Sequence, residues 1–221
     1  KMEIKPPAVF VVGNVVKLRE EMRWFDNRPL FGKRIIVTRS RSQASRLVTV
    51  LDQKGAETLE IPTIAIRDPS DDFKGMDEAL DRLEMYDWLI FTSQNGVDSF
   101  FRRLYQSGRD TRALGHMKIG AIGPATARQL TRHGLHADCV PAKYKAENLL
   151  AEMKPLLKGY EKVLIPRAKV ARSVLPEGLR DLGCRVDVVE AYRTEADTAH
   201  KEELLDVLEH HGADIITFTS S

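Results

Sequence analysis

The chain has few cysteines, no long apolar run and almost no net charge. Its 221 residues include two cysteines, Cys139 and Cys184, which are too few for a disulfide scaffold and fit a reducing compartment. The longest apolar run, Ala8 to Val12, is far shorter than the roughly 20 residues of a membrane span. The formal net charge of +2 gives no sign of a nucleic-acid-binding protein. No charged and then apolar leader opens the sequence, so we expect a cytoplasmic protein with neither a nucleic-acid nor a membrane partner.

The composition is that of a folded protein, and the sequence repeats internally. Hydrophobic residues make up 43% of the chain and charged residues 30%, which suffices for a core and a solvated surface. A strand, a helical pattern and a glycine follow one another from Arg34 and again from Lys162. The matched residues, 128 positions apart, are Arg39 and Arg167, Leu47 and Leu175, Leu51 and Leu179, and Gly55 and Gly183.

A second block repeats at an offset of 127 residues. The first copy of this block is Asp87-Trp-Leu-Ile-Phe-Thr-Ser93, and the second copy is Asp214-Ile-Ile-Thr-Phe-Thr-Ser220. No second copy of Lys118-Ile-Gly-Ala-Ile-Gly-Pro-Ala-Thr126 follows. We therefore expect two copies of one unit, the second of them truncated at its C-terminus.

Within the first copy, strands alternate with helices. This alternation predicts an α/β fold of doubly wound parallel sheets, with one lobe for each copy. Gly134 is expected to end the last helix, and Pro62 to interrupt a strand over 57–66. The other expected strands are 35–38, 89–92 and 118–122, and the helices that follow them are 44–51, 97–105 and 125–133.

Four loops are expected to surround a ligand site, because such sheets bind ligands beyond the carboxyl ends of their strands. Each loop opens a helix with small or polar residues, whose free backbone N–H groups favour anions. Helix capping alone explains any one loop, but the four together, with the charges of Arg39, Arg41, Arg167 and Lys169, favour a cleft for a polyanionic small molecule. The loops are 39–42, 93–96, 123–126 and 167–169.

Other motifs carry less weight. Gly120-Ala-Ile-Gly123 lacks the spacing of a dinucleotide site, and the sequence has no Walker A motif. His133-Gly-Leu-His136-Ala-Asp-Cys139 is interpreted as a helix-to-strand turn, because Gly134 separates its potential metal ligands, so no metal site is expected. Tyr192 stands where the first copy has Ile64. A phenol at that position is either a strand residue in packing or a proton donor to a leaving group.

Five motifs, in order and spacing, resemble uroporphyrinogen-III synthase over residues 34–221. The resemblance implies two doubly wound parallel-sheet lobes joined by a two-stranded linker, with the C-terminal lobe incomplete. One lobe would combine residues 32–61 and 195–221, and the other would span 62–194 with the linker strands. The motifs are Val37-Thr38-Arg39, Leu89-Ile-Phe-Thr-Ser-Gln-Asn-Gly96, Ile119-Gly-Ala-Ile-Gly-Pro-Ala-Thr-Ala127, Leu164-Ile-Pro-Arg167 and Ala191-Tyr-Arg-Thr194.

The resemblance also implies a reaction, in which hydroxymethylbilane is cyclised to uroporphyrinogen III with inversion of ring D and loss of water. No cofactor is implied for this step. By matching position, Tyr192 is the candidate to protonate the departing hydroxyl. The residues implied in binding the substrate carboxylates are Arg39, Ser93, Gln94, Asn95, Gly123, Pro124, Ala125, Thr126, Arg167 and Ser220.

Residues 1–31 resemble a different family, the C-terminal tail of uroporphyrinogen-III C-methyltransferase. The similar residues are Pro7-Ala-Val-Phe-Val-Val-Gly-Asn-Val-Val-Lys-Leu-Arg19, Trp24-Phe25 and Pro29-Leu-Phe-Gly32. The implied partner is a covalently fused methyltransferase, whose body, with its S-adenosylmethionine site, is absent here. A cytosolic two-lobed anion-binding protein without catalysis remains the alternative. A nucleotide-dependent transferase is disfavoured by the missing phosphate motifs.

Overall fold

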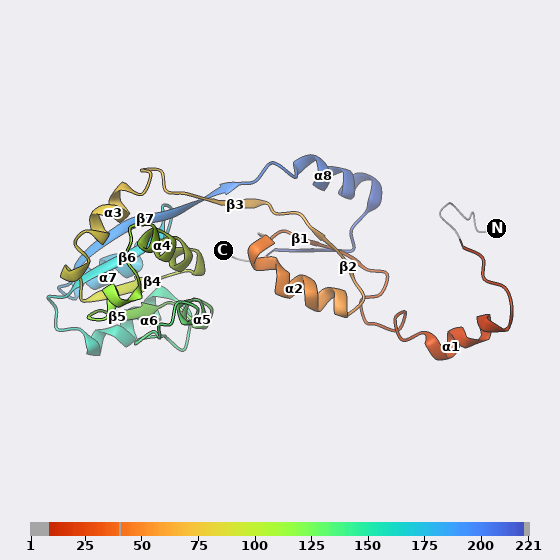
Figure 1. The fold of residues 1–221 in the computed structure, drawn as a ribbon, viewed down its shortest axis with the longest axis horizontal. Helices are drawn as coiled ribbons and strands as arrows, with labels where there is room; N and C mark the ends of the chain where they lie inside the picture. The colour runs from red at the N-terminus through yellow and green to blue at the C-terminus, as the bar shows by residue number, and fades with distance from the viewer. Residues whose placement is uncertain (1–8, 40, 219–221) are drawn as a thin grey trace. The chain divides into compact units, whose positions relative to one another are not determined.

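The computed structural model describes residues 9–39 and 41–218, and the chain divides into two compact units (Figure 1). The first unit comprises Lys1–Ala65 with Ala196–Ser221, and the second comprises Ile66–Glu195. No helix among the described residues is long and apolar enough to cross a membrane.

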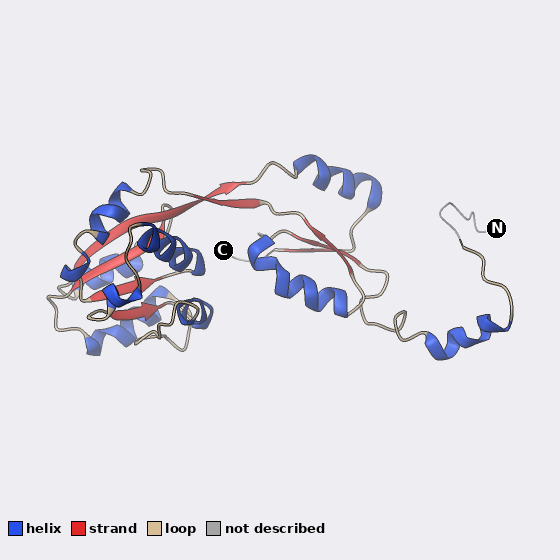
Figure 2. Cartoon of the chain, viewed as in Figure 1, coloured by secondary structure: helices blue, strands red, loops and turns tan. Residues whose placement is uncertain are grey.

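The second unit is built around a sheet with the strand order β3-β7-β6-β4-β5, in which β7, β6, β4 and β5 run parallel (Figure 2). The expected alternation of strands and helices is therefore confirmed. The strands are β3 (Ile64–Arg67), β4 (Trp88–Phe91), β5 (Lys118–Ala121), β6 (Lys162–Ala168) and β7 (Arg185–Ala196). The α-helices are α3 (Lys74–Leu80), α4 (Gln94–Gln106), α5 (Pro124–Thr131), α6 (Ala146–Met153) and α7 (Val174–Asp181), with 3-10 turns at Leu83–Met85, Thr111–Leu114 and Lys154–Leu156.

Both faces of this sheet are covered, as period-two alternation along β4 requires. Leu89 and Phe91 face one way and pack in a core with α3, α4 and α5. Trp88 and Ile90 face the other way and pack in a core with α6 and α7. All four side chains are buried, which explains why the sequence shows a continuous apolar run here.

The first unit contains a smaller parallel sheet with the strand order β2-β1-β8. Its core centres on Ile36, Ile61 and Val207. The strands are β1 (Arg34–Val37), β2 (Glu57–Glu60) and β8 (Ile215–Thr217), and the helices are α2 (Arg41–Gln53), α8 (Lys201–Asp206) and a π-helical turn, Val207–His211.

The segment before β1 is helical in two short pieces, a 3-10 turn (Asn14–Leu18) and α1 (Arg19–Met22). The residues 9–12 before it have no regular structure, and their apolar side chains are 62 to 90% exposed. Further apolar side chains along this segment, including that of Trp24, are also exposed.

The repeat reappears in the strand registers. Arg34 pairs with Glu57 in one sheet, and Lys162 pairs with Arg185 in the other, each residue 128 positions further on. An aspartate repeats too: Asp87 accepts a hydrogen bond from Lys162 N at 2.8 Å, and Asp214 accepts one from Arg34 N at 2.9 Å. Each sheet therefore combines the first two strands of one copy with later strands of the other: β8 joins β1 and β2, and β4 and β5 join β6 and β7.

One expected strand is wrong as a single element. Residues 57–66 form β2 and β3, which belong to different sheets. Pro62 lies between them and has no N–H to donate to a ladder, whereas the flanking Ile61 and Thr63 donate to Val37 O and Thr38 O. The interruption is thus the point at which the chain leaves the first sheet.

Candidate active site

The carboxyl ends of β4, β5, β6 and β7 meet at one edge of the five-stranded sheet, called here the carboxyl edge. Tyr192 lies there on β7, next to Ala168 of β6, and its side chain is only 7% exposed. Its Oη is 2.9 Å from Ser93 Oγ, in the loop that follows β4. The sequence predicted both residues for the site, and the fold brings them into hydrogen-bond contact.

Ser93 is fixed because it caps α4. Its Oγ accepts a hydrogen bond from Gly96 N at 3.0 Å, as N-cap serines commonly do. Gly96 is needed for close approach, since a Cβ at this position would lie 3.0 Å from Pro166 O of β6. The first turn of α4, with Gln94 and Asn95, is therefore held directly over the end of β6.

A second helix, α5, begins beside α4. Gly123 is its N-cap and Pro124 its first residue, so the N–H groups of Ala125 and Thr126 precede the helical hydrogen-bond ladder. Such groups favour an anion. The side chain of Thr126 is only 3% exposed, so its expected contact with substrate remains a prediction.

Arg167, at the end of β6, has a structural task that the sequence did not reveal. Its guanidinium donates to Arg172 O at 2.7 Å and to Ala171 O at 2.9 Å, which orders the loop before α7. Burial, with a smaller contribution from Arg180, lowers the pKa of Arg167 below its usual range. Its expected role in binding a carboxylate remains a prediction.

A polar network beside Tyr192 was also missed. Glu190 accepts hydrogen bonds from Ser70 N at 2.8 Å and from Ser70 Oγ at 2.7 Å. Lys169 donates its Nζ to the same Ser70 Oγ at 2.9 Å and its backbone N–H to Tyr192 O at 3.1 Å. Ser70 lies 99 positions before Lys169 and 120 before Glu190, and no periodicity or motif links it to them.

Two expected binding residues belong to the first unit. Arg39 follows β1 and is half-buried. Ser220 lies outside the described residues, as does Ser40 of the expected loop 39–42. Their expected contacts with a substrate remain predictions.

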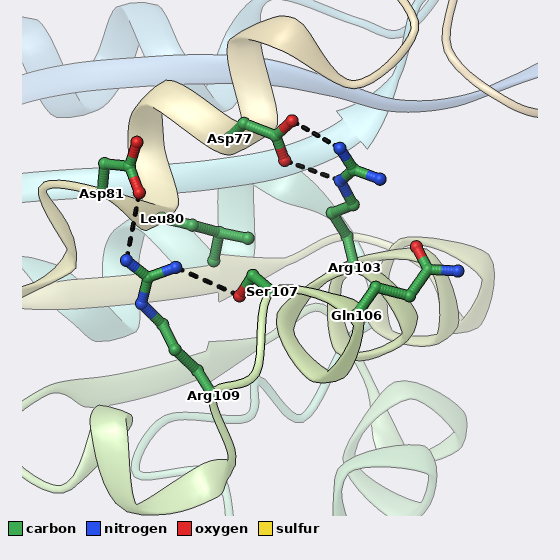
Figure 3. A pocket seen from close by; sticks show the side chains of 7 residues that line it. All are labelled: Asp77, Leu80, Asp81, Arg103, Gln106, Ser107 and Arg109. Atoms are coloured by element: carbon green, nitrogen blue, oxygen red, sulfur yellow. Dashed lines mark hydrogen bonds and ion pairs between the residues drawn. The ribbon is translucent and has the colours of Figure 1, made fainter.

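The depression shown in Figure 3 is not at the carboxyl edge. It lies between α3 and the C-terminal part of α4, the opposite end of that helix from Ser93, and encloses about 280 Å³. Its charges are already paired: Arg103 donates to both oxygens of Asp77 at 2.6 and 2.5 Å, which lowers the pKa of that carboxyl. Arg109 donates to Asp81 at 3.0 Å. An anion entering here would have to displace a carboxylate.

Two comparisons with known proteins agree on the family. The family model of uroporphyrinogen-III synthase HemD matches residues 45–221. The porphyrin biosynthesis protein HemD of Ruminiclostridium josui is 35% identical over the whole chain, which spans 44% of that protein. A putative uroporphyrinogen-III synthase of Methanothermobacter thermautotrophicus is 37% identical over 83% of this chain and 72% of its own length.

A solved structure agrees on the fold. A mutant uroporphyrinogen III synthase from the extremely thermophilic bacterium Thermus thermophilus superposes with a TM-score of 0.62 at 22% identity, covering 86% of this chain and 73% of that one. The fold, the extent of the family match and the identity to the Methanothermobacter thermautotrophicus relative lead to one conclusion. The chain belongs to the uroporphyrinogen-III synthase family.

Proposed function

We propose that the protein cyclises hydroxymethylbilane to uroporphyrinogen III, with inversion of ring D and loss of water. The observation that carries the proposal is the Tyr192–Ser93 hydrogen bond at the carboxyl edge. The name of one relative supplies the product, uroporphyrinogen III, and the family resemblance implies the substrate and the reaction. The groups around this bond suit that chemistry.

The substrate is a linear tetrapyrrole with eight carboxylates, so binding requires many donors and positive charge. The carboxyl edge offers the N-termini of α4 and α5 and the ammonium of Lys169. Several weak carboxylate contacts spread along the edge would hold the chain of pyrroles in a curved shape. Closure then becomes an intramolecular step between positioned ends, which is the main contribution expected of this enzyme.

Loss of the hydroxyl group leaves a delocalised cation, so a weak acid suffices. Tyr192 is the proposed donor to the departing hydroxyl, which leaves as water. In this role Ser93 donates its own proton toward the phenol oxygen and stabilises the negative charge that develops there. The pyrrole proton released when the macrocycle closes returns to Tyr192, so the enzyme ends the cycle unchanged.

The test mixes freshly made hydroxymethylbilane with the full-length protein, oxidises the products and separates the type I and type III isomers by chromatography. The proposal predicts predominantly type III at a rate above that of the blank. If a folded sample gave only the type I isomer at the uncatalysed rate, the proposal would be refuted. The competing function, an anion-binding protein without catalysis, would then remain.

We further propose that residues 1–31 are the end of a fused uroporphyrinogen-III C-methyltransferase. The support is that the Ruminiclostridium josui protein aligns with all 221 residues and is more than twice as long, and that residues 9–12 expose an apolar surface suited to a neighbouring domain. The full-length protein should then transfer methyl groups from S-adenosylmethionine to uroporphyrinogen III. Absence of that transfer would refute the fusion while leaving the synthase proposal intact.

We also propose a cytoplasmic location. Its support is that Cys139 and Cys184 are both buried free thiols, as expected in a reducing compartment. Fractionation of cells would place the protein with cytosolic markers. Recovery with an oxidising compartment would contradict this location.

A further inference from the structure

An exposed tyrosine stands at the end of the carboxyl edge away from Tyr192. We infer that Tyr144 is a further substrate-binding residue, whose ring face packs against a pyrrole of the bound tetrapyrrole. The inference rests on the proposed function and adds a contact for a pyrrole ring of the substrate. The other residues of the edge are proposed to bind its carboxylates and to protonate its leaving group.

Tyr144 is held against the N-cap of α5. Its Cβ, Cγ and Cδ1 lie 3.0 to 3.1 Å from the position that a Cβ on Gly123 would occupy. Only glycine therefore allows the base of this ring to rest on the start of the helix. The sequence showed Gly123 as a turn residue, but it gave no sign that an aromatic residue 21 positions later covers it.

The backbone fixes the same side chain from the other direction. Lys145 N donates to Lys143 O at 2.8 Å, which closes a three-residue turn with Tyr144 at its apex. The ring is thus presented on a short, closed turn, with one exposed lysine on each side. The side chain is 64% exposed, so most of the ring is available for contact.

Tyr144 and the Tyr192–Ser93 pair belong to one continuous edge. Phe91 of β4 pairs with Ala121 of β5, and Ile122 N continues the ladder by donating to Phe91 O at 2.9 Å. Ser93 and Gly123 each lie two residues beyond that pair, on neighbouring strands whose spacing is about 5 Å. The edge therefore carries, in order, the phenol of Tyr192, the cap of α4, the cap of α5 and the ring of Tyr144.

The ring of Tyr144 adds to this edge the apolar face that a tetrapyrrole requires. Pyrrole rings carry acidic arms, so a binding surface needs apolar faces between its anion-binding groups. An aromatic face stacks on a heteroaromatic ring, and the exposed Lys143 and Lys145, the sequence neighbours of Tyr144, add positive charge beside it. The phenol of Tyr192 is buried and hydrogen-bonded, so it cannot supply such a face.

The test compares Tyr144→Ala, Tyr144→Phe and Tyr160→Ala in the full-length protein. Tyr160 is a matched control, because it is 67% exposed but precedes β6, at the opposite edge of the same sheet. Two quantities are measured: the Kd of uroporphyrin III, by quenching of intrinsic fluorescence, and the KM and kcat for hydroxymethylbilane. Urea midpoints check that each variant is folded.

Tyr144→Ala should weaken uroporphyrin III binding and raise KM by about 3- to 10-fold, with kcat nearly unchanged, since the lost contact is to substrate and not to the reacting atoms. Tyr144→Phe keeps the ring face and should match the wild type, as should Tyr160→Ala. Unchanged Kd and KM in Tyr144→Ala would overturn the inference. An equal loss in Tyr144→Phe, or in Tyr160→Ala, would overturn it as well.

The outcomes separate this inference from the proposed function. A wild type that yields type III while Tyr144→Ala behaves normally refutes only the contact at Tyr144. A wild type that binds uroporphyrin III through Tyr144 but makes no type III refutes only the synthase activity. If the wild type neither binds the porphyrin nor turns over the bilane, both are wrong.

Discussion

At the scale of single residues, the hydroxyl of Ser93 connects helix stability to the site. Its oxygen accepts the Gly96 N–H and also contacts the Tyr192 hydroxyl, so one atom caps α4 and orients the phenol. A serine is the smallest side chain with both a donor and two acceptor positions, which this double contact requires.

Ser93→Ala should therefore affect stability and turnover together. Loss of the cap is expected to cost about 1 kcal/mol of unfolding free energy, measured by urea denaturation. Turnover should fall about 3- to 10-fold, because the phenol loses its partner. Ser107→Ala is the control: it removes a bond to Leu104 O at the other end of α4 and should leave turnover unchanged. A wild-type turnover rate in Ser93→Ala would show that the contact with Tyr192 does not contribute to the reaction.

What the sequence could predict at this scale depended on local signals. Ser93 and Gly123 were found because helix starts have recognisable residues, and the fold confirms both as N-caps. The bonds from Arg167 to its own loop and the cover that Tyr144 places on Gly123 were missed. Each depends on contacts between segments, and a residue's type does not determine which carbonyl or helix start it meets.

At the scale of elements, four glycines end their helices in the same way: Gly55, Gly108, Gly134 and Gly183. After α5, Gly134 N donates to Thr131 O and Leu135 N to Leu130 O, with Gly134 at a φ of 76°. Gly55, Gly108 and Gly183 end α2, α4 and α7 with the same pair of bonds. These ends were predictable from sequence because only glycine adopts this conformation readily. The separation of β2 from β3 was not predictable from the sequence, because it depends on which sheet each strand joins.

The contact between α4 and the end of α5 should make the second unit sensitive to acid. His133 stacks on Phe101 with ring centroids 4.1 Å apart, and its Nδ1 lies 3.0 Å from Tyr105 Oη. Burial lowers the pKa of His133; Asp98 opposes this effect and Arg132 adds to it.

A lowered pKa in the folded state means that the unfolded chain binds the proton more readily. The stability of the second unit should therefore fall as the pH drops below about 6.5, by less than about 1 kcal/mol because the ring is partly solvated. His133→Phe keeps the stacking and should remove this part of the pH dependence. The free energy of unfolding of the wild type and of His133→Phe is measured with urea at pH 7.5 and 5.5. An equal pH dependence in the two proteins would contradict the role given to His133.

At the scale of the whole molecule, the two copies of the repeat exchange strands. The sheet of the first unit takes β1 and β2 from one copy and β8 from the other, and the five-stranded sheet combines β6 and β7 with β4 and β5. Matched residues at a nearly constant offset predicted the duplication, and the strand registers reproduce that offset. The repeat alone favours one lobe for each copy, and the exchanged arrangement was expected only from the family resemblance.

The exchange makes the two units unequal. The second unit is one continuous stretch with two cores, whereas the first joins two distant stretches around the three buried residues of a small core. Amide hydrogens of β1 should therefore exchange faster than those of β4 and β6 in a native-state hydrogen-exchange experiment. Equal protection in the three strands would show that the two units unfold as one.

The central claim, that Tyr192 at the carboxyl edge supplies the proton that releases water, is tested most directly by a single-turnover measurement on Tyr192→Phe. The ring stays and only the hydroxyl is lost, so binding along the edge should persist and type III should still predominate. The rate of bilane consumption should fall about 100-fold, the lower end of what a positioned proton donor contributes. A wild-type rate with an unchanged isomer ratio would remove Tyr192 from the mechanism.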